Sequence, residues 1–415
     1  MSRKAAKSEP LSRLPGASPN LRVLTINGGS SSIKFALYEF QPGPIRSLSG
    51  KIERIGLPGP MLTLKAGGQK PEKHPVTAPT NKAAGELLIK HLESAVGFST
   101  IHGIGHRVVH GGPKFTSPQR ITRQLVAELR RLSPYDPEHL PSGIKLMELF
   151  HQRHPRVPQV ACFDTTFHRD MPRVAKLLPL PRRFDAKGVQ RFGFHGLSYS
   201  FLIQELERLA GRGAARGRVI LAHLGNGASM AAVRGGKGID TTMGFTPAAG
   251  LPMSTRSGDI DPGLVWYLAR TEKMTAQQFH EMVHHQSGLL GVSETSPDMR
   301  DLLAREGADV RAAEAVALFC YQARKWLGAY AAVLGGLDTL VFAGGIGENG
   351  PEIRERICAG LEFLGLRLDR RRNQASAAII STTASRVTVR VIRTDEEWMI
   401  AKSVCQVLGL KFDAR

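Results

Sequence analysis

Two glycine-rich segments, about 195 residues apart, constrain the fold of this chain more than any other feature. Residues 24–38 read LTINGGSSSIKFALY, and residues 219–233 read VILAHLGNGASMAAV. In each segment, two strand-like runs flank a polar glycine turn. Backbone N–H groups in such a turn can converge on phosphate oxygens, because small side chains permit a close approach. One copy indicates an ordinary turn, whereas two copies predict two related halves that face each other.

Strands alternate with helices along the chain, which indicates an α/β architecture. Its 415 residues are too many for one ordinary domain, and two or three domains are expected. The patterns predict strands at 21–27, 33–40, 101–112, 158–168, 339–345 and 387–394, in addition to the second hairpin. They predict helices at 81–95, 119–132, 142–153, 198–211, 351–364 and 395–409, and a mainly helical region over 262–336. The segment 56–80 reads as a loop, and the Pro/Arg-rich segment 171–191 reads as a domain boundary.

The composition is that of a globular protein with an excess of positive charge. The formal net charge of +20 favours anionic partners, which include phosphorylated metabolites, nucleic acid and membrane surfaces. The four cysteines are scattered without a CxxC pair, which suits a reducing cytosol. Residues 1–20 are basic and polar and read as a disordered tail, and no apolar run is long enough for a membrane span.

Two short motifs match patterns of other protein classes. GIGENG at 345–350 fits the dinucleotide-binding pattern, follows a strand and precedes a helix, and Asp369 lies where a ribose-binding acid would fall. Because only one further strand follows, a nucleotide contact is the better interpretation than a nicotinamide-binding domain. HEMVH at 280–284 matches a zinc-binding motif, but we interpret it as the solvated edge of a helix.

Several charged residues lie in loops next to glycines or aromatic residues. Arg107 stands in GHRVVHGG, Arg256 in TRSGDIDPG, Asp164 in FDTTFH and His195 in RFGFHG. Alone, each arginine is typical of an ion pair, and His195 is equally typical of a structural histidine. The segment TDEE at 394–397 begins the last helix, where carboxylates normally act as caps.

Together these segments resemble the acetate kinase family, within the superfamily of acetate and sugar kinases, heat-shock cognate proteins and actin. The resemblance runs from about residue 21 to 405 and is carried by INGGSSSIKF, GHRVVHGG, FDTTFHRDMP, RFGFHG, HLGNGAS, TTMGFTP, MSTRSGDIDPG, SGLLGVSETSPDMR, GGIGEN and TDEEWMIA. It implies an α/β fold of two actin-like (ribonuclease H-like) domains with a nucleotide-binding cleft between them. We expect one domain over 21–170 with the returning helix at 395–415, and a nucleotide-binding and dimerisation domain over 171–394.

The resemblance implies a reversible transfer of a phosphoryl group from ATP to acetate, which yields ADP and acetyl phosphate. It also implies Mg²⁺, with Mn²⁺ as an alternative, and a cytoplasmic homodimer that binds neither nucleic acid nor a membrane. Phosphoryl transfer between two anions requires charge neutralisation and alignment, and an ionised carboxylate needs no general base. We therefore expect direct in-line transfer.

The resemblance also assigns residues. Its active-site positions are Asn27, Arg107, Asp164, His195, Arg256 and Glu396, with Asn27, Asp164 and Glu396 at the metal and Arg107 on the substrate carboxylate. Val109, Phe194 and Pro247 match the pocket for the acyl group. The expected nucleotide-binding residues are Ser32, Lys34, His223, Leu224, Gly225, Asn226, Gly227, Asp298, Met299, Arg300, Gly344, Gly345, Ile346, Gly347, Glu348 and Asn349.

The chain departs from the family pattern in a few places. Gly28 replaces a small side chain or cysteine, which should loosen the first turn. In LSPYDPEHLPSG (132–143) the usual active-site histidine is either replaced by Asp136 or moved to His139. Leu197 and Tyr199 stand where Thr and His are commoner.

Three other functions stay open at this point. A propionate or other short-chain acid kinase of the same family is the nearest alternative. A nicotinamide-dependent dehydrogenase would rest on GIGENG, and a nucleic-acid-binding protein would rest on the net charge alone.

Overall fold

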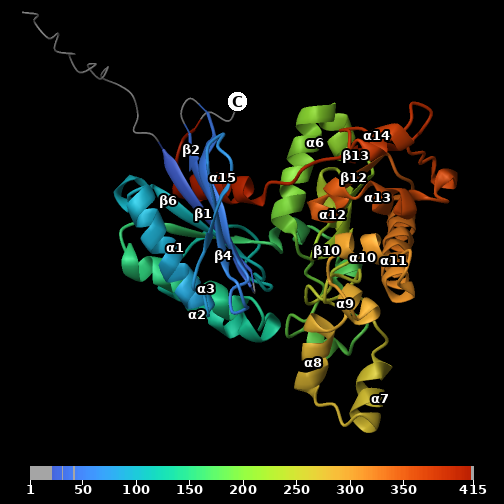
Figure 1. Cartoon of the computed structure of the whole chain (residues 1–415), viewed down its shortest axis with the longest axis horizontal. Helices are drawn as coiled ribbons and strands as arrows, with labels where there is room; N and C mark the ends of the chain where they lie inside the picture. Colours follow the sequence, from blue (N-terminus) through green and yellow to red (C-terminus); the bar gives the residue numbers. More distant parts are fainter. Residues whose placement is uncertain (1–20, 30, 41–42, 413–415) are drawn as a thin grey trace, which may run out of the picture.

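The computed structural model describes residues 21–29, 31–40 and 43–412, and it contains two β-sheets, each covered by helices (Figure 1). The first sheet has the strand order β5-β4-β3-β2-β1-β6-β8-β7. Its strands are β1 (Arg22–Gly28), β2 (Ser32–Glu39), β3 (Ile45–Glu53), β4 (Met61–Ala66), β5 (Glu72–Pro75), β6 (Gly103–Val108), β7 (Gln119–Arg120) and β8 (Gln159–Phe163). The expected tail at 1–20 lies outside the described residues.

The second sheet repeats the topology of the first. Its order is β11-β10-β9-β12-β13, with β9 (Val219–Leu224), β10 (Ala228–Arg234), β11 (Lys237–Thr241), β12 (Thr339–Ala343) and β13 (Thr388–Val391). In both sheets an antiparallel three-stranded unit is followed by two parallel strands: β3-β2-β1-β6-β8 in the first and β11-β10-β9-β12-β13 in the second. The two related halves that the glycine hairpins predicted are therefore present.

The long helices cover the faces of the two sheets, except that the two at 263–271 and 276–285 extend away from the second sheet (Figure 1). They are α1 (Asn81–Ala95), α2 (Arg123–Leu132), α3 (Leu140–Arg153), α6 (Gly196–Arg216), α7 (Gly263–Thr271), α8 (Ala276–His285), α11 (Val310–Leu334), α13 (Pro351–Cys358) and α15 (Glu396–Leu408). Shorter helices are α4 (Arg173–Lys176), α5 (Arg182–Asp185), α9 (Gly288–Ser293), α10 (Met299–Arg305), α12 (Gly344–Asn349) and α14 (Arg370–Gln374). None of these described helices has the length and apolar character that a bilayer-spanning segment needs.

Helix α15 returns from the second half of the chain and packs on the first sheet. Ile400 and Val404 belong to a buried cluster with Val23 and Val160. A Cβ at Gly105 would lie 2.3 Å from Ile400 Cγ2 and 2.7 Å from Val404 Cγ2. Glycine at position 105 therefore lets the last helix approach the centre of the first sheet.

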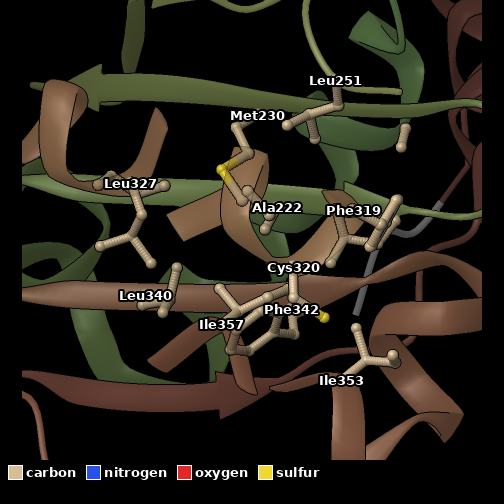
Figure 2. Packing of buried hydrophobic residues seen from close by; sticks show 14 of the residues in the cluster. Ala222, Met230, Leu251, Phe319, Cys320, Leu327, Leu340, Phe342, Ile353 and Ile357 are labelled. Carbon is tan, nitrogen blue, oxygen red and sulfur yellow. The ribbon is translucent and has the colours of Figure 1, made fainter. Parts of the chain in front are cut away.

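The core of the second half is formed around α11, which packs against β10 and β9 (Figure 2). Phe319 and Leu327 of α11 are fully buried, as are Met230, Leu340 and Phe342 of the sheet. Burial of each such side chain stabilises the fold by about 1.5–3 kcal/mol. Helix α11 starts at Asp309, whose carboxylate accepts the N–H groups of Arg311 and Ala312, and ends at Gly335 in the left-handed conformation.

The predictions of individual elements differ from the structure in several places. The segment 56–80 contains strands β4 and β5, so the prediction of a loop was wrong: β5 is an edge strand, which charged and proline residues suit. Strands β3 and β11 and helices α12 and α14 were not foreseen, and 171–191 contains the short helices α4 and α5. The helix predicted over 119–132 begins only at Arg123, because 119–120 form strand β7. The proposed division into 21–170 with 395–415 and 171–394 stays a prediction, although each sheet lies within one of these ranges.

Candidate functional site

Four polar residues meet at one edge of the first sheet. Strands β1, β6 and β8 are parallel neighbours, so their carboxyl ends bring Asn27, Arg107 and Asp164 together. Arg107 Nε and Nη2 donate to Asp164 Oδ2 at 3.0 and 2.6 Å, and its Nη1 donates to Asn27 Oδ1 at 3.1 Å. Asn27 Nδ2 donates to Glu396 Oε2 at 3.0 Å, at the start of α15. These predicted site residues therefore form one hydrogen-bonded network.

The carboxylates of this network differ in their surroundings. Burial acts to raise the pKa of Glu396, but Arg107, His223 and Lys34 hold that pKa below its usual value. Burial, together with the charge of Glu396, raises the pKa of Glu397, which accepts a second bond from Asn27 Nδ2 at 3.3 Å. Burial also raises the pKa of Asp164, and Arg107 opposes that shift. The network thus carries a stable negative charge at Glu396.

His195 lies immediately before α6 in the left-handed conformation, with φ 58°. The backbone N–H of the next residue, Gly196, donates to the carbonyl of Asp164 at 2.9 Å, which places His195 beside the first-sheet network. Burial, followed by the charges of His223 and two arginines, lowers the pKa of His195 well below its usual value. His195 is therefore neutral at pH 7.

A chain of hydroxyl groups orients the His195 ring. Its Nδ1 lies 2.8 Å from Ser229 Oγ, and Ser229 Oγ is in turn bonded to the Tyr199 hydroxyl. If Tyr199 donates to Ser229 and Ser229 donates to Nδ1, the proton of the neutral ring is on Nε2. A Cβ at Gly227 would lie 3.2 Å from this Nε2, so the second glycine hairpin meets His195 there.

Arg256 approaches the same point from the loop before α7. Its Nη1 donates to the carbonyl of Pro247 at 3.1 Å and lies 3.6 Å from the Cβ position of Gly227. Burial and the nearby Arg107 lower the pKa of Arg256 from that of a free guanidinium, which nevertheless stays charged at neutral pH. Two arginines and one neutral histidine, from both halves of the chain, thus converge near the second hairpin.

The structure brings both candidate replacements for the missing histidine into this region. His139 Nδ1 lies 2.8 Å from Asp136 Oδ1, and Asp136 is buried, with its Oδ2 free of any hydrogen-bond partner in the described part of the chain. The charge of Asp136 opposes the lowering of the Arg256 pKa by burial and Arg107, and His139 acts electrostatically on Asp164. The two side chains form a pair that acts electrostatically on both Arg256 and Asp164.

The residues of the predicted acyl pocket are buried beside this charged region. Val109 and Phe194 belong to the same apolar cluster, and Pro247 is buried and bonded to Arg256. His110, the neighbour of Val109, contacts the rings of Phe192, Phe194 and Tyr135 edge-on. This aromatic wall was not foreseen, because its members are far apart in the sequence.

The predicted nucleotide-binding glycines also come together. Strands β9 and β12 are parallel neighbours, and the turn at 224–227 lies against the start of α12. The Cβ position of Gly225 lies 3.7 Å from the backbone nitrogen of Gly345. Gly344 donates its N–H to Glu348 Oε1 at 3.0 Å, and Asn349 Nδ2 donates to the carbonyl of Gly345 at 2.9 Å. His223 stacks on His195 with ring centroids 4.3 Å apart.

The remaining predicted nucleotide residues are more scattered. Asp298 caps helix α10 and pairs with the exposed Arg300, whereas Met299 is buried in the core of the second half. Lys34 acts electrostatically on Glu396 and His223. The carbonyl of Ser32 accepts the N–H of Gly29 at 2.7 Å, and the hydroxyl of Ser30 lies outside the described residues.

Arg354 forms hydrogen bonds to the glycine-rich segment 344–349, and it was not predicted from the sequence. It is fully buried, and its Nη1 donates to the carbonyls of Gly347 and Glu348 at 2.8 and 3.1 Å. Its Nε and Nη2 bind Asn373 at 2.8 and 2.7 Å. Ser229 and Glu397 were missed as well, although both lie inside quoted motifs, and Tyr199 was noted only as a departure from the family pattern. Their contacts join distant segments, so no local pattern could indicate them.

The HEMVH segment also lies differently from the prediction. His284 is buried, and His280 Nε2 and His285 Nε2 each lie 2.9 Å from one oxygen of Glu138. The interpretation of a solvated helix edge was therefore wrong, because the carboxylate of a loop beside the first sheet bonds to this helix. Helix α8 is thus linked to the segment that carries Asp136 and His139.

The carboxylates of the site suit a hard cation. In the described part of the chain, Asp164 Oδ1 is buried without a hydrogen-bond partner, and Glu396 is held in its charged form. Asn27 is already engaged, since its oxygen accepts from Arg107 and its nitrogen donates to Glu396. No group of three or more His, Cys, Asp or Glu among the described residues is arranged to hold a metal. Mg²⁺ commonly binds one or two carboxylates and completes its shell with water and phosphate oxygens.

The fold and the site define a class: a two-sheet α/β protein with a charged, arginine-containing site between two halves of the same topology. A model of the acetokinase family matches residues 22–402. The chain therefore belongs to the acetokinase family, and the predicted family membership is confirmed.

Individual relatives agree with this assignment. The chain is 43% identical over 388 residues to an acetate kinase of Rhodopseudomonas palustris, a match that covers 92% of this chain and 97% of that protein. It is 42% identical over 393 residues to a propionate kinase of Citrobacter rodentium, covering 93% and 96%. Among solved structures, the acetate kinase of Porphyromonas gingivalis has a TM-score of 0.83 at 37% identity, covering 94% of this chain and 100% of that one. The propionate kinase of Francisella tularensis has a TM-score of 0.87 at 34% identity, covering 93% and 100%. The predicted fold class is thus confirmed.

Proposed function

We propose that this protein is an acetate kinase, which transfers a phosphoryl group between ATP and a short-chain carboxylate. The observation that carries the proposal is that Arg256 and the neutral His195 meet at Gly227 of the second glycine hairpin, with Arg107 acting electrostatically on both. Membership of the acetokinase family supports the same activity.

Arg107 is suited to hold the substrate carboxylate. A guanidinium has five N–H donors, and three hydrogen bonds to Asp164 and Asn27 use three of them. The two remaining donors can bind a carboxylate, and Asp164 and Asn27 fix the plane of the guanidinium meanwhile. The buried Val109 and Phe194 would receive the apolar end of the acid.

Arg256 and His195 are suited to the phosphoryl group during transfer. The guanidinium of Arg256 supplies positive charge in a buried place, and the neutral His195 ring supplies one N–H at Nε2. Backbone N–H groups of the turn at 224–227 and of α12 would hold the nucleotide phosphates. The acceptor is already ionised, so the site needs no general base.

We further propose that Asp164 and Glu396 hold a Mg²⁺ ion. When bound, the ion would neutralise charge on the phosphates. Asn27 would orient Glu396 through its amide N–H, rather than act as a ligand as the sequence suggested. The unpartnered Oδ1 of Asp164 and the charged Glu396 support this assignment.

Acetate is the proposed acceptor, and propionate is the alternative. Relatives of nearly equal identity carry both names. The segment 132–143, which departs from the family pattern, lies beside the site, and an assay with both acids identifies the preferred one.

The first test measures ADP release with a panel of C1–C4 acids, and hydroxylamine traps any acyl phosphate. We expect an acyl hydroxamate with acetate, propionate or both, and no change in nicotinamide absorbance. Absence of acyl hydroxamate with every acid would contradict the proposal, and reduction of a nicotinamide would favour the dehydrogenase alternative.

The same assay tests the role of Arg256. Replacing it with alanine should lower kcat by about 10²-fold or more, because a charge that faces the transferring group is lost. ADP binding, measured by calorimetry, should persist. Arg212→Ala, at an exposed position on α6, is the matched control. Near-normal turnover in Arg256→Ala would refute the assigned role.

We also propose a cytoplasmic homodimer. Helix α7 supports the dimer, since it has no buried residue although its sequence GLVWYLART is mainly apolar. Trp266 and Tyr267 are 68% and 60% exposed, and a second copy of the chain is the occupant we propose for this face.

A further inference from the structure

A second cleft lies at the outer edge of the first sheet, between α2 and α3. Its volume is about 820 Å³, within the range typical of small-molecule sites. Its apolar lining includes Ile121, Val126, Met147 and Val157. Three arginines, Arg120, Arg123 and Arg130, line it as well. The cleft is therefore apolar inside and positively charged.

Two of these arginines are free to bind a ligand. Arg130 pairs with Glu148, which also lines the cleft. Arg120 and Arg123 are exposed, and neither side chain has an ion-pair or hydrogen-bond partner in the part of the chain that the structure describes. The two guanidinium groups thus give the cleft two uncompensated charges.

The start of α2 adds backbone donors at the same place. Thr122 caps the helix by accepting the N–H of Leu125, so the N–H groups of Arg123 and Gln124 have no acceptor among the described residues. These N–H groups and the positive end of the helix dipole favour an anion. A tetrahedral phosphate uses several donors at once, which suits this set.

A buried amide marks the base of the cleft. Gln159 is 4% exposed, and its Nε2 donates to the carbonyl of Met147 at 3.3 Å. A side-chain hydrogen bond with Gln159 also raises the pKa of the buried His106, against the larger opposite effect of burial. The amide of Gln159 is therefore held in place by the fold, at the cleft that it lines.

We propose that this cleft is a second ligand site, for a small phosphate ester with an apolar body. The phosphate binds Arg120, Arg123 and the start of α2, and the apolar body packs on Val126, Met147 and Val157. The cleft is separate from the proposed kinase site. Strand β8 and helix α3 contribute to both sites, but with different parts of their length. Strand β8 begins at Gln159 and leads to Asp164, and α3 begins beside His139 and reaches the cleft at Met147 and Glu148.

Phenyl phosphate is the probe, because it combines one phosphate with one apolar ring. Calorimetry on the full chain, with ADP and Mg²⁺ present to occupy the nucleotide site, should show saturable binding. The variant Arg120→Gln/Arg123→Gln should weaken it at least 10-fold, and phenol and inorganic phosphate should each bind more weakly than phenyl phosphate. The matched control Arg212→Gln/Arg216→Gln removes the same charge from exposed positions on α6 and should bind normally.

Kinase activity separates this proposal from the proposed function. The Arg120→Gln/Arg123→Gln variant should keep kcat and KM within about twofold of the parent chain. Loss of activity in this variant would show that the arginines serve the kinase site, and so overturn the second site. Absence of saturable binding, or equal binding by both double variants, would overturn it as well, whatever the acyl hydroxamate assay shows.

Discussion

Gly28 and Gly344 are both glycines at the ends of strands, but their surroundings differ. The Cβ position of Gly28 lies 3.6 Å from Leu146 Cδ2, an ordinary contact, and its φ is not positive. Gly344 has φ +76°, and its Cβ position lies 2.6 Å from the carbonyl oxygen of Leu224. Only the backbone at Gly344 therefore requires a glycine. At Gly28 the folded backbone would accept a side chain, so the extra freedom that this glycine gives the chain affects mainly the unfolded state.

We predict opposite effects of alanine at these two positions. Gly28→Ala should raise the free energy of unfolding by about 0.4–1 kcal/mol, because it restricts the unfolded chain without strain. Gly344→Ala should lower it and weaken ADP binding, since the added methyl group collides with the neighbouring strand. Urea unfolding and calorimetry measure both. A lower free energy of unfolding for Gly28→Ala would contradict the conclusion that a methyl group fits at this position without strain.

Residues within one motif could be predicted from the sequence, whereas their partners could not. Arg107, Asp164 and Glu396 were named from motifs, and the structure brings them into one network. Arg354 was not named, because nothing in PEIRERI distinguishes the buried Arg354 from an exposed arginine. Its burial depends on Asn373, which lies on another element.

At the scale of elements, the GGIGEN segment shows how a motif can be identified and its conformation mistaken. The glycines suggested a loop, but residues 344–349 form the helix α12. Arg354 binds two carbonyls at the end of this helix, and Glu348 accepts N–H groups from Gly344 and Thr394. Tertiary hydrogen bonds therefore overcome the low helix propensity of three glycines.

Helix α7 gives a prediction about assembly. The double variant Trp266→Glu/Tyr267→Glu should be monomeric, because two charges would be placed in a face that a second chain must bury. Light scattering after gel filtration gives the mass. Val174→Glu, at a position 80% exposed on the short helix α4, is the control and should not change it. A dimeric double variant would show that the copies associate elsewhere.

At the scale of the whole molecule, buried histidines make stability depend on pH. Burial lowers the pKa values of His106, His110, His168 and His223 to about 4, and it lowers that of His195 well below its usual value. In the unfolded chain these pKa values return to about 6.5. As pH falls below 6.5, the unfolded chain binds protons that the folded chain does not, so stability decreases until about pH 4.

We therefore predict a loss of stability between pH 7.5 and 5.5. Each buried histidine contributes at most about 1.4 kcal/mol per pH unit below 6.5. Urea unfolding at several pH values measures the slope. His106→Gln should reduce this slope, and the exposed His151→Gln should leave it unchanged. Equal slopes in both variants would contradict the assignment.

The repeated topology could be anticipated, because both glycine hairpins lie between strands of the right pattern. Strand β4 and the edge strands β5 and β11 could not, since their exposed residues resemble those of loops. The contact between the two halves at Glu138 was also beyond sequence reasoning: its partners His280 and His285 follow it by more than 140 residues.

The position of that contact has a mechanical consequence. Helix α8 lies at the end of the molecule opposite the chain crossing from β13 to α15 (Figure 1), and its residues His280 and His285 bond to Glu138. If the halves turn about that crossing, bonds at Glu138 act on the longest lever arm. The two bonds of Glu138 to His280 and His285 then oppose the separation of the halves with a larger torque than bonds of equal strength near the crossing would. A weak polar contact, placed there, can set how far the two halves swing apart.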